Sequence, residues 1–173
     1  PSNVHDCEYA MGAINFTGDF PVILTQDGPS LGGFVCPVTV AKAELWKVGQ
    51  VKPGDRIRFY PISVEDAVAR EKAQDRSIEM LHVCAAPAFD VPSLADRDGV
   101  SAAALVSLPA TASAPAIVYR QAGDKYILIE YGDNVLDLAL RLRVHVLTAH
   151  LRELAHPGIK ELSPGVRSLQ VRY

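Results

Sequence analysis

The sequence predicts a mixed α/β protein that is mainly β, and three observations predict this class. Over residues 1–62, short apolar runs alternate with turns rich in glycine, proline and aspartate, which is typical of neighbouring strands. Residues 85–116 are rich in alanine and proline and predict a linker. Residues 117–173 then follow the pattern of a small β-α-β-β lobe. With 49% hydrophobic residues in 173, the chain can form a real core.

The first segment, 1–62, predicts two strands, a short helix and a further strand. Apolar residues fill 9–16 and 20–24, and Thr17-Gly18-Asp19 between them favours a turn. Residues 39–48 have apolar side chains at helical spacing. In 56–62 apolar and charged residues alternate, so we expect a strand that closes the segment.

The remaining segments predict one polar helix and one amphipathic helix. Ser63 followed by Asp66 is a capping pattern, so 63–84 should be a connecting helix with few large apolar residues. The lobe at 117–173 should contain a strand at 126–131, a turn and helix N-cap at Gly132-Asp133-Asn134, a helix ending near Pro157, and two strands at 158–162 and 167–173. The expected core stripe of that helix consists of Val135, Leu138, Leu142, Val146 and Leu154.

Composition excludes several functions. The net charge of −3 argues against nucleic acid and against an anionic membrane surface as partners, and no apolar run is long enough to span a bilayer. Three scattered cysteines form no disulfide or zinc pattern, which favours a reducing, cytoplasmic location. His145 and His150 are five residues apart and do not share a helix face, so no metal site is predicted. A chain that begins with Pro1 is expected to be a fragment.

Residues 12–33 form the densest run of small, polar and turn-forming residues. Asn15 and Asp19 flank a glycine turn, and the pair Gly32-Gly33 allows the backbone to approach a ligand closely. An amide beside a carboxylate suits a small, planar substrate that forms hydrogen bonds. The same residues are also compatible with two hairpin turns in which Asn15 and Asp19 bond only to local backbone groups.

Several motifs carry a resemblance to one family. Residues 5–59, which include N-F-T-G-D-F-P and D-G-P-S-L-G-G-F, resemble the end of the first half of the carboxyltransferase domain of biotin-dependent urea carboxylases. Y-R-Q-A-G-D-K at 119–125, E-Y-G-D-N at 130–134 and P-G-I-K-E-L-S-P-G-V-R-S-L-Q-V-R-Y at 157–173 resemble the opening of that domain's second half. The resemblance covers both ends of the chain and leaves the alanine- and proline-rich stretch unmatched.

The resemblance implies a fold and an activity. The first segment would be the C-terminal part of a cyclophilin-like β-barrel, and the last segment a small α/β lobe. Carboxybiotin, made in a separate biotin carboxylase domain that uses ATP and Mg, would reach the site on a carrier domain and transfer its carboxyl group to urea, giving allophanate. The expected partners are therefore urea and the biotin carboxyl carrier and biotin carboxylase domains.

Urea offers four N–H donors and one acceptor, which suggests roles for the residues of the turn. Asn15 and Asp19 are the catalytic candidates, and Asn15, Thr17, Gly18 and Asp19 the substrate-binding candidates. Gly32, Gly33 and Lys42 are candidates for contact with the cofactor, and Lys42 or Lys47 for stabilising an anion. For both lysines a solvated helix face is the competing interpretation.

Other functions stay open on the sequence alone. A guanidine carboxylase or a subunit of the 5-oxoprolinase type would also bind a planar amide-like ligand. A function of another class is a non-catalytic module that docks other domains through an exposed edge of the strand at 126–131. Because the family's site is built between two halves, we expect the isolated chain to be inactive.

Overall fold

The computed structural model describes residues 3–83 and 104–173. The strands are β1 (Asn3–Glu8), β2 (Ala13–Thr17), β3 (Phe20–Ile23), β4 (Leu31–Phe34), β5 (Val38–Thr39), β6 (Ala104–Leu108), β7 (Ile117–Gln121), β8 (Tyr126–Tyr131), β9 (Glu161–Pro164) and β10 (Ser168–Arg172). The helices are the 3₁₀ turn η1 (Lys42–Glu44), α1 (Leu45–Val48), α2 (Val64–Glu79) and α3 (Leu138–Leu154). The predicted class, mainly β with a few helices, is confirmed.

The chain divides into two compact units. Pro1–Thr39 and Ala102–Tyr173 form the first unit, and Val40–Ser101 forms the second. The β-rich start of the chain therefore packs with the predicted C-terminal lobe. This arrangement has no signal in the sequence, because the contacts that join the two parts lie more than a hundred residues apart.

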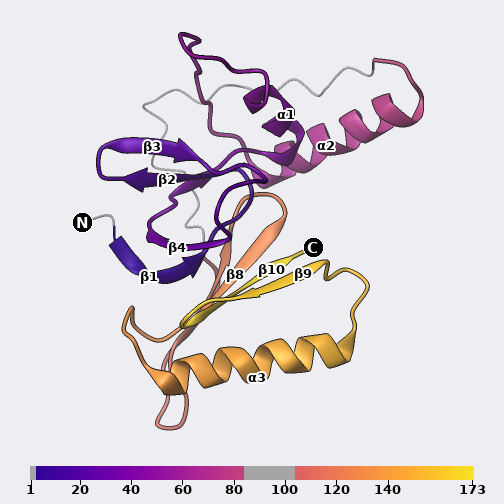
Figure 1. The fold of residues 1–173 in the computed structure, drawn as a ribbon. Coiled ribbons are helices and arrows are strands. Elements are labelled where there is room, and N and C mark those ends of the chain that lie inside the picture. The colour runs from indigo at the N-terminus through magenta and orange to yellow at the C-terminus, as the bar shows by residue number, and fades with distance from the viewer. Residues whose placement is uncertain (1–2, 84–103) are drawn as a thin grey trace. The chain divides into compact units, whose positions relative to one another are not determined.

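A five-stranded antiparallel sheet is the centre of the first unit. Its strand order is β6-β7-β8-β10-β9, and α3 covers one face, as Figure 1 shows. Alternate residues of β8 point toward α3, as expected for a pleated strand. The core between the sheet and the helix consists of Ile129, Tyr131, Leu140, Val144, Leu169 and Val171. The predicted β-α-β-β order of the lobe is thus confirmed in β8, α3, β9 and β10.

The apolar stripe predicted for α3 is wrong. Every member of that stripe is exposed, from Val135 to Leu154, whereas Leu140 and Val144 are buried against the sheet. The helix begins after Asp137, whose side chain accepts a hydrogen bond from the Ala139 N–H, and not at the Gly132-Asp133-Asn134 turn. Both helix faces carry leucine and valine, so helical spacing alone could not identify the core face.

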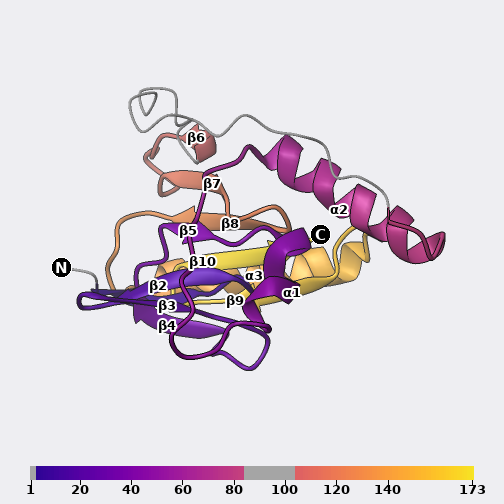
Figure 2. The ribbon, with the colours of Figure 1, turned by 90° about the horizontal axis from the view of Figure 1, so that it is seen from above.

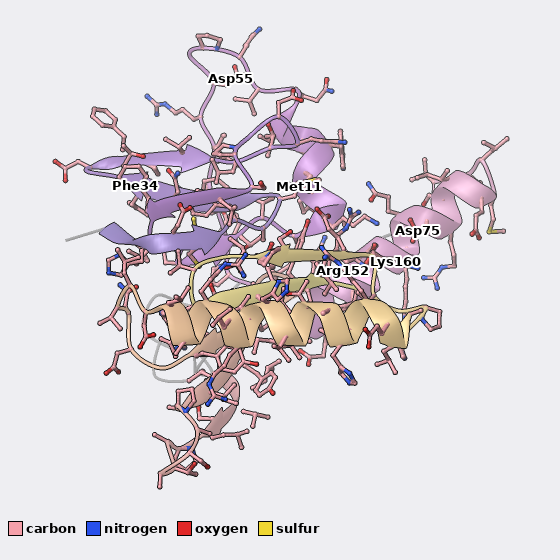
Figure 3. The ribbon with its side chains drawn as sticks, turned by 60° about the horizontal axis from the view of Figure 1, so that its bottom comes forward. Met11, Phe34, Asp55, Asp75, Arg152 and Lys160 are labelled. Atoms are coloured by element: carbon pink, nitrogen blue, oxygen red, sulfur yellow. The ribbon has the colours of Figure 1, made fainter. Side chains whose placement is uncertain are left out.

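The first strands of the chain cover the other face of this sheet. They form a two-stranded sheet of β1 and β4 and a three-stranded sheet in the order β3-β2-β5, visible above β8 and β10 in Figure 1 and over them in Figure 2. A second core joins them to β8 and contains Tyr9, Ala10, Ala13, Leu24 and Tyr126. Met11 and Phe34, labelled in Figure 3, pack against it. These described strands do not close into a barrel.

Three expectations for the first segment need correction. The run at 9–16 is not one strand, because a turn at 9–12 separates β1 from β2. The helix expected at 39–48 is reduced to η1 and α1. Residues 56–62 form no strand, and Ile57 and Phe59 are exposed. Alternation predicts a strand only where another strand is present to pair with it. The strand expected at 20–24 is confirmed as β3.

The second unit consists mainly of α2 packed on η1. Ser63 caps α2 as predicted, its side chain accepting a 3.0 Å hydrogen bond from the Asp66 N–H. Ala43, Ala67 and Ala73 are buried where the helices meet. Part of the predicted linker differs from expectation, since 104–108 form β6, whereas 84–103 lie outside the described residues. Among the helices described, none has the length and apolar character needed to cross a membrane.

Candidate functional site

Asn15 lies in the middle of β2 and is almost fully buried. The residue is 6% exposed, and its Oδ1 accepts a hydrogen bond of 3.3 Å from the Thr17 hydroxyl. Its amide nitrogen donates a hydrogen bond to no group among the described residues. This nitrogen is also not among the described side-chain atoms that are fully buried without a partner, so it keeps a small contact with solvent. Strand alternation places Asn15 on the same face of β2 as Ala13, which belongs to the core that includes Tyr126. An amide with an unused donor therefore lies close to the contact between the first strands and β8.

The turn that follows Asn15 is open to solvent. Gly18 has a φ of +63°, a conformation that favours glycine, and closes the hairpin between β2 and β3. Thr17 and Asp19 are both exposed. The predicted turn is confirmed in its shape, and its carboxylate is available to accept hydrogen bonds from a ligand that reaches the hairpin.

A second polar cluster surrounds Glu8 and has no local sequence signal. Glu8, at the end of β1, is 4% exposed and accepts two short hydrogen bonds from the far end of the chain. The Gly165 N–H donates to Oε1 at 2.6 Å, and the Ser168 hydroxyl donates to Oε2 at 2.6 Å. No sequence pattern separates Glu8 from other acidic residues, because its partners are 157 and 160 positions away.

The Glu8 cluster fixes the first strands against β9 and β10. The Val166 N–H adds a backbone hydrogen bond to the Asp6 carbonyl, at 3.4 Å. Beside it, Arg167 bonds the Glu130 carboxylate at 2.7 Å and the Gly132 carbonyl at 3.2 Å. Gly165 allows this approach, since a Cβ there would lie 2.9 Å from the Glu8 carboxyl carbon. The contact between the two ends of the chain is therefore specific and polar.

Burial raises the pKa of Glu8 above its usual range, although the Ser168 and Gly165 hydrogen bonds oppose the shift. Burial, with the negative charge of Glu8 nearby, also raises the pKa of the Cys7 thiol to about 12. Burial raises the pKa of Cys36 to about 11. Both thiols therefore stay protonated at neutral pH and are poor nucleophiles.

The raised pKa of Glu8 predicts that stability falls with rising pH. The folded chain keeps a proton on Glu8 at pH values where the unfolded chain, with the ordinary pKa of 4.5, has lost it. This contribution to the free energy of unfolding is complete below pH 4.5 and is lost as pH rises through the raised pKa. Glu8→Gln cannot ionise, so its thermal midpoint should gain on that of the wild type as the pH rises above the ordinary pKa of 4.5 and through the raised pKa of Glu8. A constant difference between the two midpoints would contradict the prediction.

The glycines predicted to meet the cofactor have contacts within the chain. Gly32, in β4, faces the ring of Tyr9, and a Cβ at this position would lie 2.5 Å from the ring atoms. Gly33 follows it in β4, where a Cβ would meet the Val4 carbonyl at 3.2 Å. Packing thus explains the need for glycine at Gly32 without a ligand.

The two lysines lie in the second unit and are both paired. The Lys42 ammonium contacts the buried Glu71 carboxylate at 2.5 Å. Lys47 forms an ion pair with Glu44 and lies 5.7 Å from the centre of the Trp46 ring. These contacts agree with the interpretation of both lysines as part of a helix surface.

Two cavities are described, and Asn15 lines neither. One, of about 500 Å³, lies between α2 and the η1–α1 segment, and the other, of about 440 Å³, lies at the end of α3 beside β9. No group of three or more potential metal ligands occurs within residues 3–83 and 104–173. β8 lies between β7 and β10, so the free edge expected for 126–131 does not exist.

Comparison with known proteins matches the two ends of the chain to one kind of domain. Residues 1–61 match the family model of subdomains A and B of the carboxyltransferase domain, and residues 117–173 match the model of its subdomains C and D. The polar Glu8 contact thus joins the A/B part to the C/D part. The chain consists of segments of a carboxyltransferase domain.

Individual relatives show which carboxyltransferase-containing proteins the chain is similar to. The whole chain aligns with the urea amidolyase of Saccharomyces cerevisiae, at 46% identity over 182 residues, and with that of Lachancea kluyveri, at 48% identity over 178 residues. It covers 9% of the length of each. The chain is 41% identical over 165 residues to a putative urea carboxylase of Emericella nidulans. That alignment includes 90% of this chain and 13% of the relative.

Solved structures give the same result. The crystal structure of the Kluyveromyces lactis urea carboxylase matches 99% of this chain with a TM-score of 0.88 and 44% identity, and the chain covers 15% of that structure. The chain therefore belongs to the urea carboxylase and urea amidolyase family, in its carboxyltransferase region. The resemblance seen in the sequence is confirmed.

Proposed function

We propose that this chain supplies urea-binding residues to a carboxyltransferase site that transfers a carboxyl group from carboxybiotin to a urea nitrogen. The observation that carries the proposal is Asn15, which is almost fully buried and whose amide nitrogen has no partner among the described residues. An amide held in place with one unused donor gains a hydrogen bond when a ligand with an acceptor binds beside it. The names of the relatives, urea amidolyase and urea carboxylase, support urea as that ligand.

The chemistry of urea fits these groups. The Asn15 N–H₂ would donate to the urea carbonyl oxygen, and the exposed Asp19 carboxylate would accept from a urea N–H₂. The Thr17 hydroxyl holds Oδ1 of Asn15 and so fixes the orientation of the amide. These residues would orient the attacking nitrogen and exclude water from one side of it, while Gly18 shapes the turn.

The glycine and lysine residues predicted to contact biotin are engaged elsewhere. The space beside Gly32 is filled by Tyr9, and the Lys42 ammonium is paired with Glu71. Bound biotin would supply the activated carboxyl group, and we propose that residues outside this chain position it. In the whole enzyme, biotin would be attached to a carrier domain, with ATP and Mg used in a separate biotin carboxylase domain. The first strands would complete a cyclophilin-like barrel with further strands of the same enzyme.

Asn15→Ala in the full-length enzyme is expected to lower kcat/KM for urea about tenfold, because a lost hydrogen bond of about 1.4 kcal/mol corresponds to that factor. The measurement is urea-dependent ADP release, with the urea-independent carboxylation of biotin followed in parallel. The carboxylation of biotin should be unchanged, since Asn15 would contact urea alone. Guanidinium as a second substrate shows whether the effect is specific to urea.

Asn134→Ala is the matched control. Asn134 is exposed, is not part of the β2–β3 hairpin, and its Oδ1 accepts a hydrogen bond from the His5 N–H at 3.3 Å. This variant should keep the wild-type kcat/KM. An unchanged kcat/KM for urea in Asn15→Ala would disprove the proposed role of Asn15. An equal loss of urea-dependent ADP release and of biotin carboxylation would indicate general damage to the fold.

A further inference from the structure

The Glu8 contact joins two parts of the chain that belong to different subdomains. Glu8 lies at the end of β1, within the part that matches subdomains A and B, and both of its donors lie within the part that matches subdomains C and D. Hydrogen bonds are directional, whereas apolar contacts are not. Two bonds of 2.6 Å to two separate donors therefore set both the distance and the orientation between β1 and the β9–β10 hairpin.

A carboxyl group at this position is a costly way to gain stability alone. Glu8 is 4% exposed, and its burial carries a desolvation penalty that the hydrogen bonds only offset. The neighbouring core around Tyr9 and Tyr126 contains apolar and aromatic side chains, and an apolar side chain at position 8 would avoid the penalty. What the carboxyl group adds is a defined position of β1 on the five-stranded sheet.

A stiff connection leads from Glu8 to Asn15. The turn between β1 and β2 is closed by a hydrogen bond of 3.0 Å from the Ala13 N–H to the Ala10 carbonyl. The Ala13 carbonyl accepts another, of 2.8 Å, from the Leu24 N–H. Ala13 is 1% exposed and precedes Asn15 by two residues on the same face of β2. A shift of β1 would therefore also displace the strand that carries Asn15.

We propose that Glu8 is a positioning residue for carboxyl transfer. It holds the strand that carries Asn15 in a fixed place on the five-stranded sheet, so that urea bound at Asn15 is aligned with the carboxyl group to be transferred. Reacting atoms must be held about 3–3.5 Å apart, and a misplacement of about 1 Å can lower the rate about a hundredfold. This role of Glu8 rests on the urea-binding role proposed for Asn15.

Glu8→Ala in the full-length enzyme is expected to lower kcat for urea-dependent ADP release at least about tenfold, with KM for urea within about twofold of the wild type. Asn15 would still bind urea, so the loss should appear in the alignment of the reactants. The urea-independent carboxylation of biotin should be unchanged. Glu8→Gln keeps an acceptor for one donor and should restore most of kcat. A loss that appears only as a higher KM would overturn the inference.

Val144→Ala is the matched control for lost stability. Val144 is fully buried in the core between α3 and the sheet, on the face of the sheet opposite the Glu8 contact. Below the thermal midpoints of all variants, Val144→Ala should keep the wild-type kcat. An equal fall in kcat in Val144→Ala and Glu8→Ala would show that stability explains the loss. If Glu8→Ala does not fold, Ser168→Ala removes one donor and should still lower kcat, and a wild-type kcat would contradict the role of Glu8.

The double variant of Glu8→Ala and Asn15→Ala separates this inference from the proposed function. If Glu8 acts through Asn15, Glu8→Ala should lower kcat/KM by less in the Asn15→Ala background than in the wild type. Equal effects in both backgrounds would refute the positioning role and leave the role of Asn15 intact. An unchanged kcat/KM in the single variant Asn15→Ala would instead refute the urea-binding role on which the inference rests.

Discussion

Replacing Glu8 with alanine is expected to lower the free energy of unfolding of the chain by about 3 kcal/mol, because two buried donors lose a hydrogen bond to the carboxylate and a cavity is left, although the Gly165 N–H keeps its 2.9 Å bond to the Ser168 carbonyl. The donors are the Gly165 N–H and the Ser168 hydroxyl, both 2.6 Å from the carboxylate. The loss should be seen as a lower thermal midpoint. It should also weaken the contact of β1 with β9 and β10, which amide hydrogen exchange in these strands would report.

Glu8→Gln is the control for this result. Its amide oxygen can still accept from one donor, and the Ser168 hydroxyl can accept from the new N–H₂, so most of the stability should remain. Ser168→Ala removes one donor and leaves one carboxylate oxygen without its partner, and should have an intermediate effect. If alanine and glutamine at position 8 are equally damaging, or alanine is harmless, the hydrogen bonds to Glu8 do not hold the two ends together.

The elements that could be predicted from sequence are those with local signals. The Ser63 cap identified the start of α2, and the apolar run at 126–131 identified β8. The core face of α3 could not be predicted, because Leu142 is exposed while Leu140 is buried, and only the position of the sheet distinguishes them. The prediction of a strand at 56–62 is wrong for a similar reason, since the alternation of apolar and charged residues does not show whether a neighbouring strand is there to pair with.

The candidate site divides in the same way. Asn15 and the Gly18 turn follow from local turn chemistry, and the structure adds that Asn15 is buried while its amide keeps an unused donor. The Glu8 cluster depends on contacts between the two ends of the chain and has no local signal. The sequence suggests backbone access to a ligand at Gly32, whereas in the structure the missing side chain makes room for Tyr9.

Gly32→Ala is therefore expected to destabilise the fold by about 2–3 kcal/mol, in the upper part of the range for overpacked sites. The new Cβ would lie 2.5 Å from Cε2 and from the hydroxyl of Tyr9, so the ring must move. Movement would also break the 2.7 Å hydrogen bond that the Phe34 N–H donates to the Tyr9 hydroxyl. Thermal or chemical unfolding of the chain measures the loss.

A double-mutant cycle separates this packing role from cofactor contact. Tyr9→Leu removes the ring atoms that meet the new Cβ, so Gly32→Ala should cost much less in the Tyr9→Leu background than in the wild type, with a coupling of about 1–2 kcal/mol between the two positions. If Gly32 served a ligand instead, Gly32→Ala would lower activity in the full-length enzyme while leaving unfolding unchanged, and no coupling to Tyr9 would appear. Gly33→Ala is the neighbouring control, because its Cβ would meet a single backbone oxygen at 3.2 Å and should disturb the fold less.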